Sequence, residues 1–172
     1  MNIRKMTELA MLTAVALIIF VVELQIPNPI PIPGVKLGLA NIITVFALYH
    51  FRPREVLMLV LARIVMGCFF SGNMMALMYS LAGGLLCLSG MVPLRHILPK
   101  NSIWIGSVLG AVLHNVGQIL AACLTVGLGA LFYLPPLLIS GCAAGAFTGI
   151  CAQLVIEKSW RKKGKKQNTL DN

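Results

Sequence analysis

An arginine inside an apolar stretch is the first residue of this sequence that could do chemistry. Arg63 lies near the middle of the apolar run from Val56 to Phe70. A charge at that depth is costly and usually faces a protein interior or water. Glu8, Glu55 and Glu157 stand beside apolar runs rather than within them, so the sequence offers Arg63 no acidic partner at its depth. Arg63 is therefore expected to bind either an anionic ligand or backbone carbonyls.

A second polar group, formed by His114, Asn115 and Gln118, interrupts the apolar run from Ile103 to Val126. Residues three and four apart on a helix are neighbours, so we predict that these three side chains share one face. Such side chains often make hydrogen bonds between membrane helices, worth about 0.6 kcal/mol on average. They could equally recognise a polar, ring-bearing ligand, and the sequence leaves both roles open.

The stretch from Pro27 to Asn41 separates two apolar runs and contains four prolines. Proline cannot donate a backbone hydrogen bond, so this stretch is predicted to be extended rather than helical. It carries Lys36 and Asn41 to the start of the next run. Irregular backbone at membrane depth usually lines a cavity or is buried in protein. The alternatives are an external loop whose Lys36 reaches the interface, or an ion pair between Lys36 and Glu23.

Residue patterns for catalysis are missing from the sequence. Asp171 is the only aspartate, and there is no paired-carboxylate Mg²⁺ site and no P-loop. The five cysteines have no metal-binding spacing, and His114 has no second ligand placed to complete a metal site. We therefore predict no catalytic residue, no metal and no bound cofactor. The cysteines are expected to act as small packing residues: Cys68, Cys87, Cys123, Cys142 and Cys151.

The composition predicts the medium in which these polar residues lie. Hydrophobic residues make up 58% of the chain and charged residues 11%, whereas soluble domains have about 25% charged residues. A chain of 172 residues cannot bury that much apolar surface away from water, so it belongs in a membrane. The net charge of +9 comes from residues between apolar runs and at the C-terminus, so no nucleic-acid partner is predicted.

The apolar runs predict an all-α integral membrane protein with six transmembrane helices. Residues 1–157 would form this membrane domain, and residues 158–172 a basic tail that we expect to be disordered. Arg4 and Lys5 before the first run resemble a signal peptide, but no convincing cleavage site follows. The six runs are Leu9–Val22, Leu37–Tyr49, Val56–Phe70, Met74–Val92, Ile103–Val126 and Leu137–Ile156.

The basic residues predict the orientation of the chain. With six spans, both termini and every strongly basic turn fall on one side, while the opposite turns hold only Lys36. The positive-inside rule then places both termini in the cytoplasm of a bacterium, with the protein in the inner membrane. The six basic residues between Lys158 and Lys166 would contact anionic lipid headgroups.

Small residues at regular spacing predict close helix packing. Gly141, Gly145 and Gly149 are four apart, and Gly83 and Gly84 form a second small patch. Ala10 and Ala14 make another such pair in the first run. That pair could pack inside the protein or dock a partner.

Four motifs, taken together, resemble the Gx transporter family, whose members are often labelled heptaprenyl diphosphate synthase component I. They are PGVKLGLANI (33–42), LARIVMGCFFSG (61–72), SLAGGLL (80–86) and HNVGQ (114–118). The family resembles the substrate-binding S components of energy-coupling-factor transporters. The resemblance implies a six-helix bundle with a substrate cavity toward the outer side. It also implies that Ala10 and Ala14 contact a coupling subunit, because they match the spacing of the contact pair in that fold.

Related proteins are connected with moving flavins for flavinylation of external redox proteins, so the resemblance points to a flavin as the transported ligand. Phe69, Phe70 and Met74 could supply an apolar slot for the flavin ring. Polar groups around it would bind its ring edge and phosphates. The predicted ligand-binding residues are Lys36, Asn41, Arg63, Phe70, Asn73, His114, Asn115 and Gln118.

The sequence therefore predicts a non-enzymatic membrane transporter for a small anionic ring-bearing molecule, with riboflavin, FMN or FAD first. Its partners would be the bilayer and either a coupling subunit or a redox complex with its flavin transferase. The rival prediction is a non-catalytic membrane subunit associated with heptaprenyl diphosphate synthase. A third is a structural subunit of a redox complex.

Overall fold

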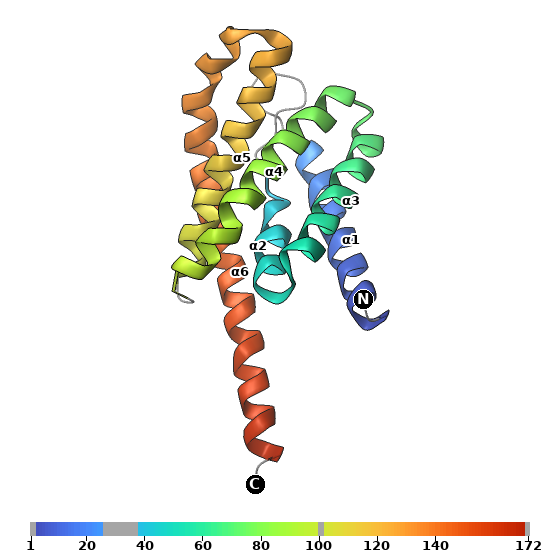
Figure 1. Cartoon of the computed structure of the whole chain (residues 1–172), viewed down its shortest axis with the longest axis vertical. Coiled ribbons are helices and arrows are strands. Elements are labelled where there is room, and N and C mark those ends of the chain that lie inside the picture. Colours follow the sequence, from blue (N-terminus) through green and yellow to red (C-terminus); the bar gives the residue numbers. More distant parts are fainter. Residues whose placement is uncertain (1–2, 26–37, 100–101, 171–172) are drawn as a thin grey trace.

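The computed structural model describes residues 3–25, 38–99 and 102–170, with side chains as far as residue 158. These residues form helices joined by short turns, without a strand among them. Figure 1 shows the arrangement. The elements are α1 (Ile3–Gln25), α2 (Asn41–His50), α3 (Pro53–Ser71), α4 (Met74–Ile97), α5 (Ile103–Val126), η2 (Leu128–Tyr133) and α6 (Leu134–Leu170). The all-α fold class is confirmed.

Local sequence signals set the ends of α3 and the beginning of α4. Pro53 stands at the first position of α3, where its missing N–H is not needed. Gly72 ends α3 in the left-handed conformation at φ 60°, which glycine adopts without strain. Asn73 then begins α4, and its side chain accepts a hydrogen bond from Met75 N at 2.9 Å. Gly72 and Asn73 therefore form the tight turn that joins α3 to α4.

Helices α4, α5 and α6 form one packed group, in which α5 lies against both neighbours. Glycines allow these contacts. A Cβ on Gly145 would lie 3.0 Å from Val108 Cα of α5, and one on Gly149 would lie 2.7 Å from Trp104 Cα. A Cβ on Gly117 of α5 would lie 2.8 Å from Gly83 Cα of α4. The predicted packing role of these small residues is confirmed.

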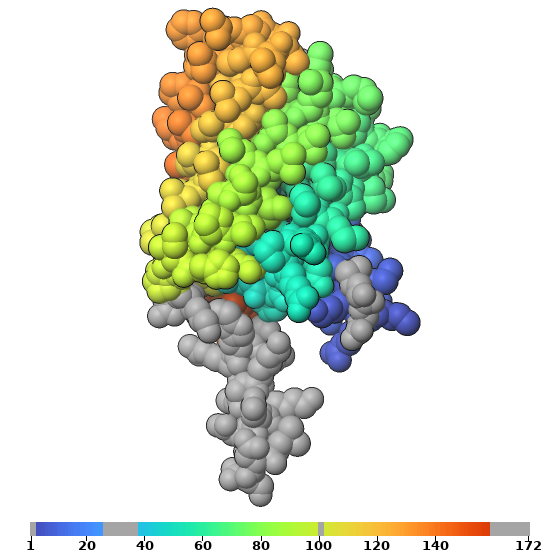
Figure 2. Space-filling model, in the orientation of Figure 1, coloured from blue at the N-terminus to red at the C-terminus, as the bar shows by residue number. Residues whose placement is uncertain are grey.

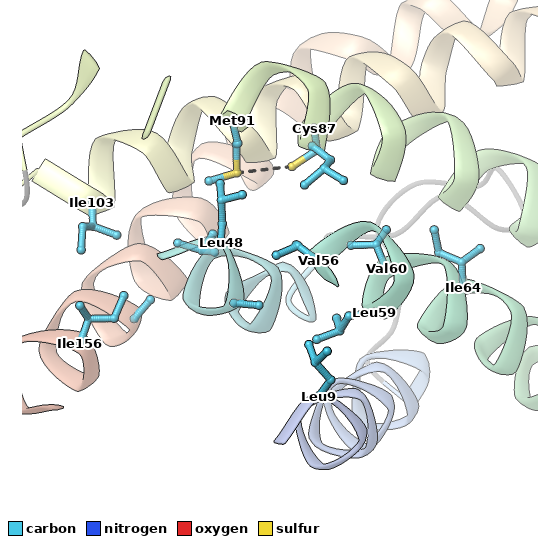
Figure 3. Close-up of a cluster of buried hydrophobic side chains, with 14 residues drawn as sticks. Leu9, Leu48, Val56, Leu59, Val60, Ile64, Cys87, Met91, Ile103 and Ile156 are labelled. Atoms are coloured by element: carbon cyan, nitrogen blue, oxygen red, sulfur yellow. Dashed lines mark hydrogen bonds between the residues drawn. The ribbon is translucent and has the colours of Figure 1, made fainter. Parts of the chain in front are cut away.

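Helix α2 lies at the centre of the largest apolar cluster (Figure 3). Leu48 of α2 contributes to this cluster together with Val60 of α3, Met91 of α4 and Ile156 of α6. Each of these side chains is at most 2% exposed. The short helix therefore connects the α4–α6 group with α1 and α3.

Within the described residues, four helical segments are long and apolar enough to cross a membrane, so the chain is a multi-pass membrane protein. They are Ile3–Gln25, Met74–Ile97, Ile103–Val126 and Leu128–Lys158. Helix α3 has 19 residues but carries three charges, and α2 has only ten residues. Ten residues rise about 15 Å, half of a hydrocarbon core of about 30 Å. Six spans therefore stay a prediction, as does the cytoplasmic placement of both termini.

The expected disorder of the C-terminal tail is wrong for the residues that the structure describes. Helix α6 continues without a break through residues 158–170 and ends at Leu170. The physical reason is that an already formed helix extends at low cost, and lysine, arginine and glutamine are good helix formers. Figure 1 shows this part of α6 extending beyond the bundle. Whether residues 1–157 act as a separate membrane domain stays a prediction.

Candidate functional site

A small polar cavity lies among the helices at the position of Arg63. It is lined by α1, α3, α4 and α5 together with the residues that lead into α2. Its free volume is about 20 Å³, which is room for about one water molecule. Ligand pockets for drug-sized molecules are usually about 300–1,000 Å³. Its lining includes Glu23, Gly38, Arg63, Cys68, His114 and Gln118.

Arg63 is only 6% exposed, and its surroundings are acidic and polar. Its Nη2 donates to Asn41 Oδ1 over 3.4 Å. Glu23, also 6% exposed, lines the same cavity and acts electrostatically on Arg63. The expectation that Arg63 has no acidic partner at its depth is therefore wrong. Helix α1 packs against α3, and Glu23 near the end of α1 therefore lines the same cavity as Arg63 in the middle of α3.

The Glu23 carboxylate also accepts a hydrogen bond from the backbone just before α2. Gly38 N donates to Glu23 Oε1 at 2.6 Å. Gly38 has φ 81°, and a Cβ there would lie 3.1 Å from the Asn41 side chain and 3.4 Å from His114. Only glycine satisfies both the positive φ and the space. Glu23 is the main site residue that the sequence prediction missed, although a lone carboxylate at the end of an apolar run was a usable signal.

His114 and Gln118 form the other side of the cavity. Gln118 Nε2 lies 2.8 Å from His114 Nε2, and both side chains are at most 3% exposed. If the amide donates, His114 carries its proton on Nδ1, beside the backbone of Gly83. A Cβ on Gly83 would lie 2.7 Å from His114 O, so glycine makes room for this histidine.

Asn115 does not join this group. Its Nδ2 donates to Leu137 O of α6 at 2.8 Å, and its side chain is fully buried. The prediction that His114, Asn115 and Gln118 share one face is therefore wrong for Asn115. Residues one apart on a helix point about 100° apart, so Asn115 faces α6 while His114 faces the cavity. Asn115 acts as a link between helices.

The other predicted binding residues lie outside the cavity. Asn73 begins α4, and Phe70 is 62% exposed. Phe69 and Met74 line a separate apolar cleft of about 420 Å³ between α3 and α4. Cys68 lines both this cleft and the polar cavity. The predicted apolar slot is thus beside the polar group rather than continuous with it.

Three remaining predictions concern Lys36, the alanine pair and metals. Lys36 and most of the proline-rich stretch lie outside the described residues. Ala10 and Ala14 are exposed on α1, which leaves their face open to a partner. In the part of the chain that the structure describes, no three histidine, cysteine or acidic residues are grouped to hold a metal ion.

The model of one protein family, heptaprenyl diphosphate synthase component I, matches residues 12–155. The chain belongs to this family. The match runs from α1 into α6 and includes every residue named above as lining the cavity. The family resemblance inferred from the four motifs is confirmed, while the likeness of component I to energy-coupling-factor S components stays a prediction. Neither a curated protein nor a solved structure matches the chain.

Proposed function

We propose that this chain is a non-catalytic membrane subunit that associates with a heptaprenyl diphosphate synthase in isoprenoid or quinone synthesis. The observation that carries this proposal is the component I match over residues 12–155. The name component I implies a second component. The chemistry of diphosphate substrates fits a synthase in which that second component, rather than this chain, is catalytic. Diphosphates are bound through Mg²⁺ by carboxylates, and the only aspartate here is Asp171.

A membrane subunit has a physical role in such a synthase. The heptaprenyl product is a long apolar chain with a charged diphosphate, so it partitions into a bilayer as it grows. A subunit with four apolar helices would hold a soluble catalytic partner where the product leaves. In this proposal the buried polar residues Arg63, Asn41 and Glu23 hold α1, α2 and α3 together. The membrane would be the cytoplasmic membrane of a bacterium.

Copurification tests this proposal. The tagged chain is extracted from its native membranes in a mild detergent, and the bound proteins are identified. We expect an Asp-rich prenyl diphosphate synthase in a fixed ratio to the chain, and higher synthase activity when the chain is added back. If the folded chain brings down no synthase and leaves the activity unchanged, the proposal is wrong.

A second function is favoured by a specific observation, the buried polar group of Arg63, Asn41, His114 and Gln118. These side chains offer a cation and amides to a small anionic ring-bearing ligand, as a flavin transporter requires. The cavity of about 20 Å³ would have to open to admit a flavin. In that case, partners would include a coupling subunit at Ala10 and Ala14, or a redox complex with its flavin transferase.

Flavin binding separates the two functions. Riboflavin, FMN and FAD are titrated against the detergent-purified chain, and quenching of flavin fluorescence is followed. A transporter gives saturable quenching that weakens in Arg63→Ala and Gln118→Ala but not in Ser89→Ala, an exposed residue of α4. The synthase subunit gives no saturable quenching while it retains its partner.

A further inference from the structure

A second cleft, larger than the polar cavity, opens at the end of the bundle where the N-terminus lies. Its free volume is about 480 Å³, within the usual range for ligand pockets. The beginning of α1, the α2–α3 turn and the end of α4 line it, and Figures 1 and 2 show these elements at the same end. Nothing in the proposed functions uses this cleft.

The cleft is basic. Lys5 comes from α1, Arg52 from the α2–α3 turn and Arg95 from α4. Their sequence positions are far apart, so only the fold brings three permanent cations together. Glu55 is the acidic residue among the groups that line the cleft. Three cations against one carboxylate leave an excess of positive charge in a partly enclosed space, where it attracts anions more strongly than on an open surface.

Arg95 is held in place by the backbone. Its Nη1 donates to Leu48 O at 3.0 Å and to Phe51 O at 3.5 Å, which fixes the guanidinium at the end of α2. Its Nε lies 3.2 Å from His96 Nε2. A guanidinium has five N–H donors, so these contacts leave some of them for a ligand. Because its side chain is already ordered, Arg95 loses little conformational entropy on binding.

The Glu55 carboxylate is occupied by the protein itself. Glu55 Oε2 accepts from Arg52 N at 2.9 Å, and its Oε1 lies 3.7 Å from Lys5 Nζ. Lys5 is about half exposed, so this ion pair is weak and exchanges readily with another anion. The side chain of Arg52 is exposed to solvent.

His50 also lines the basic cleft and contributes a second kind of polar group to it. Its Nδ1 lies 3.2 Å from Phe46 O, which leaves Nε2 to face other partners. Nε2 is buried and has no hydrogen-bond partner among the described residues. Buried polar atoms are nearly always satisfied, so this unpaired ring nitrogen is a further polar group in the wall of the cleft.

We propose that this basic cleft binds a phosphate group. Arginine and lysine together match the geometry and charge of phosphate oxygens. The group could belong to an anionic phospholipid at the membrane surface or to a soluble phosphate or diphosphate, and the chemistry of recognition is the same for both. The site is separate from the cavity around Arg63 and from the basic tail.

The test uses the full chain in a neutral detergent and in lipid nanodiscs. Arg52→Gln and the double variant Lys5→Gln/Arg52→Gln remove exposed cations and leave Arg95 in place. Arg54→Gln is the matched control, because Arg54 is an exposed arginine two residues away that does not line the cleft. Inorganic pyrophosphate is titrated by calorimetry at fixed ionic strength. Nanodiscs of phosphatidylcholine with and without phosphatidylglycerol then measure the retention of anionic lipid by native mass spectrometry.

We expect Arg52→Gln to bind about tenfold more weakly, the factor for one lost charge-assisted hydrogen bond, and the double variant to bind more weakly still. A loss seen with pyrophosphate assigns the site to a soluble phosphate compound. A loss seen only as reduced phosphatidylglycerol retention assigns it to a lipid headgroup. If the parent chain binds neither probe, or if Arg54→Gln weakens binding as much as the double variant, the proposal is wrong.

Discussion

At the residue scale, the main feature of this protein is that its buried charges are compensated within the bundle. Arg63 donates a hydrogen bond to Asn41 Oδ1 over 3.4 Å and interacts with the charge of Glu23, which lines the same cavity of about one water molecule. Both charged side chains are 6% exposed. Removing one partner of a buried pair leaves the other uncompensated, which costs more than removing both.

A double-mutant cycle should show this compensation. We expect Glu23→Gln and Arg63→Met each to destabilise the fold, while the double variant loses less than the sum. The coupling energy should be about 1–3 kcal/mol. Reversible unfolding in mixed micelles measures it. The exposed pair Arg4 and Glu8, 3.4 Å apart, is the control and should couple by less than about 1 kcal/mol. Equal coupling in the two pairs would contradict the compensation.

Glu55, which precedes the apolar run of α3, should make the stability of the fold depend on pH. The hydrogen bond from Arg52 N, and then the charge of Lys5, lower the pKa of the Glu55 carboxyl. A lowered folded-state pKa contributes stability above the unfolded value of about 4.3, and that contribution is lost as the pH falls through the folded value. Glu55→Gln keeps an acceptor but does not titrate. Its melting temperature should therefore fall less than that of the parent between about pH 5 and pH 3.

At the element scale, glycines decide how closely α4, α5 and α6 approach. Gly83, Gly117 and Gly145 stand where a Cβ would meet the backbone or Cβ of the neighbouring helix within about 3 Å. The same close approach places His114 and Gln118 of α5 against the cavity. The site therefore depends on backbone contacts as well as on its polar side chains.

Gly117→Ala tests this dependence. A Cβ at Gly117 would lie 2.8 Å from Ala82 O, so α4 and α5 must separate. We expect a loss of about 1–3 kcal/mol in the free energy of unfolding, as for other overpacked interiors. Gly129→Ala is the control, because nothing lies within 4 Å of its Cβ position. An unchanged stability of Gly117→Ala in the same unfolding assay would mean that the helices adjust without cost.

At the scale of the whole molecule, three basic residues from distant parts of the described chain gather at one end. Lys5, Arg52 and Arg95 line a single cleft, although they belong to three separate elements. Figure 1 shows the N-terminus and the end of α6 on that same side of the bundle. This arrangement agrees with the charge pattern from which the orientation was predicted. The membrane side that this end faces stays a prediction.

Reporter fusions test that orientation. We expect green fluorescent protein fused to either terminus to be fluorescent, and alkaline phosphatase fused after Lys158 to be inactive, because both ends face the cytoplasm. A phosphatase fused in the turn at Gly127 should be active, since that turn lies at the opposite end of α5 from its start at Ile103. Active phosphatase at the C-terminus would reverse the orientation or change the number of spans.

The sequence alone determined that this is a helical membrane protein with Arg63, His114 and Gln118 at buried positions. Composition and apolar runs are sufficient for that conclusion because a bilayer admits few backbone structures. Only the tertiary structure decided which polar residues meet. Glu23 reaches Arg63 because α1 packs against α3, and Asn115 faces α6 because one residue turns a helix face by about 100°. The basic cleft likewise depends on contacts between helices that are distant in sequence, which local patterns do not specify.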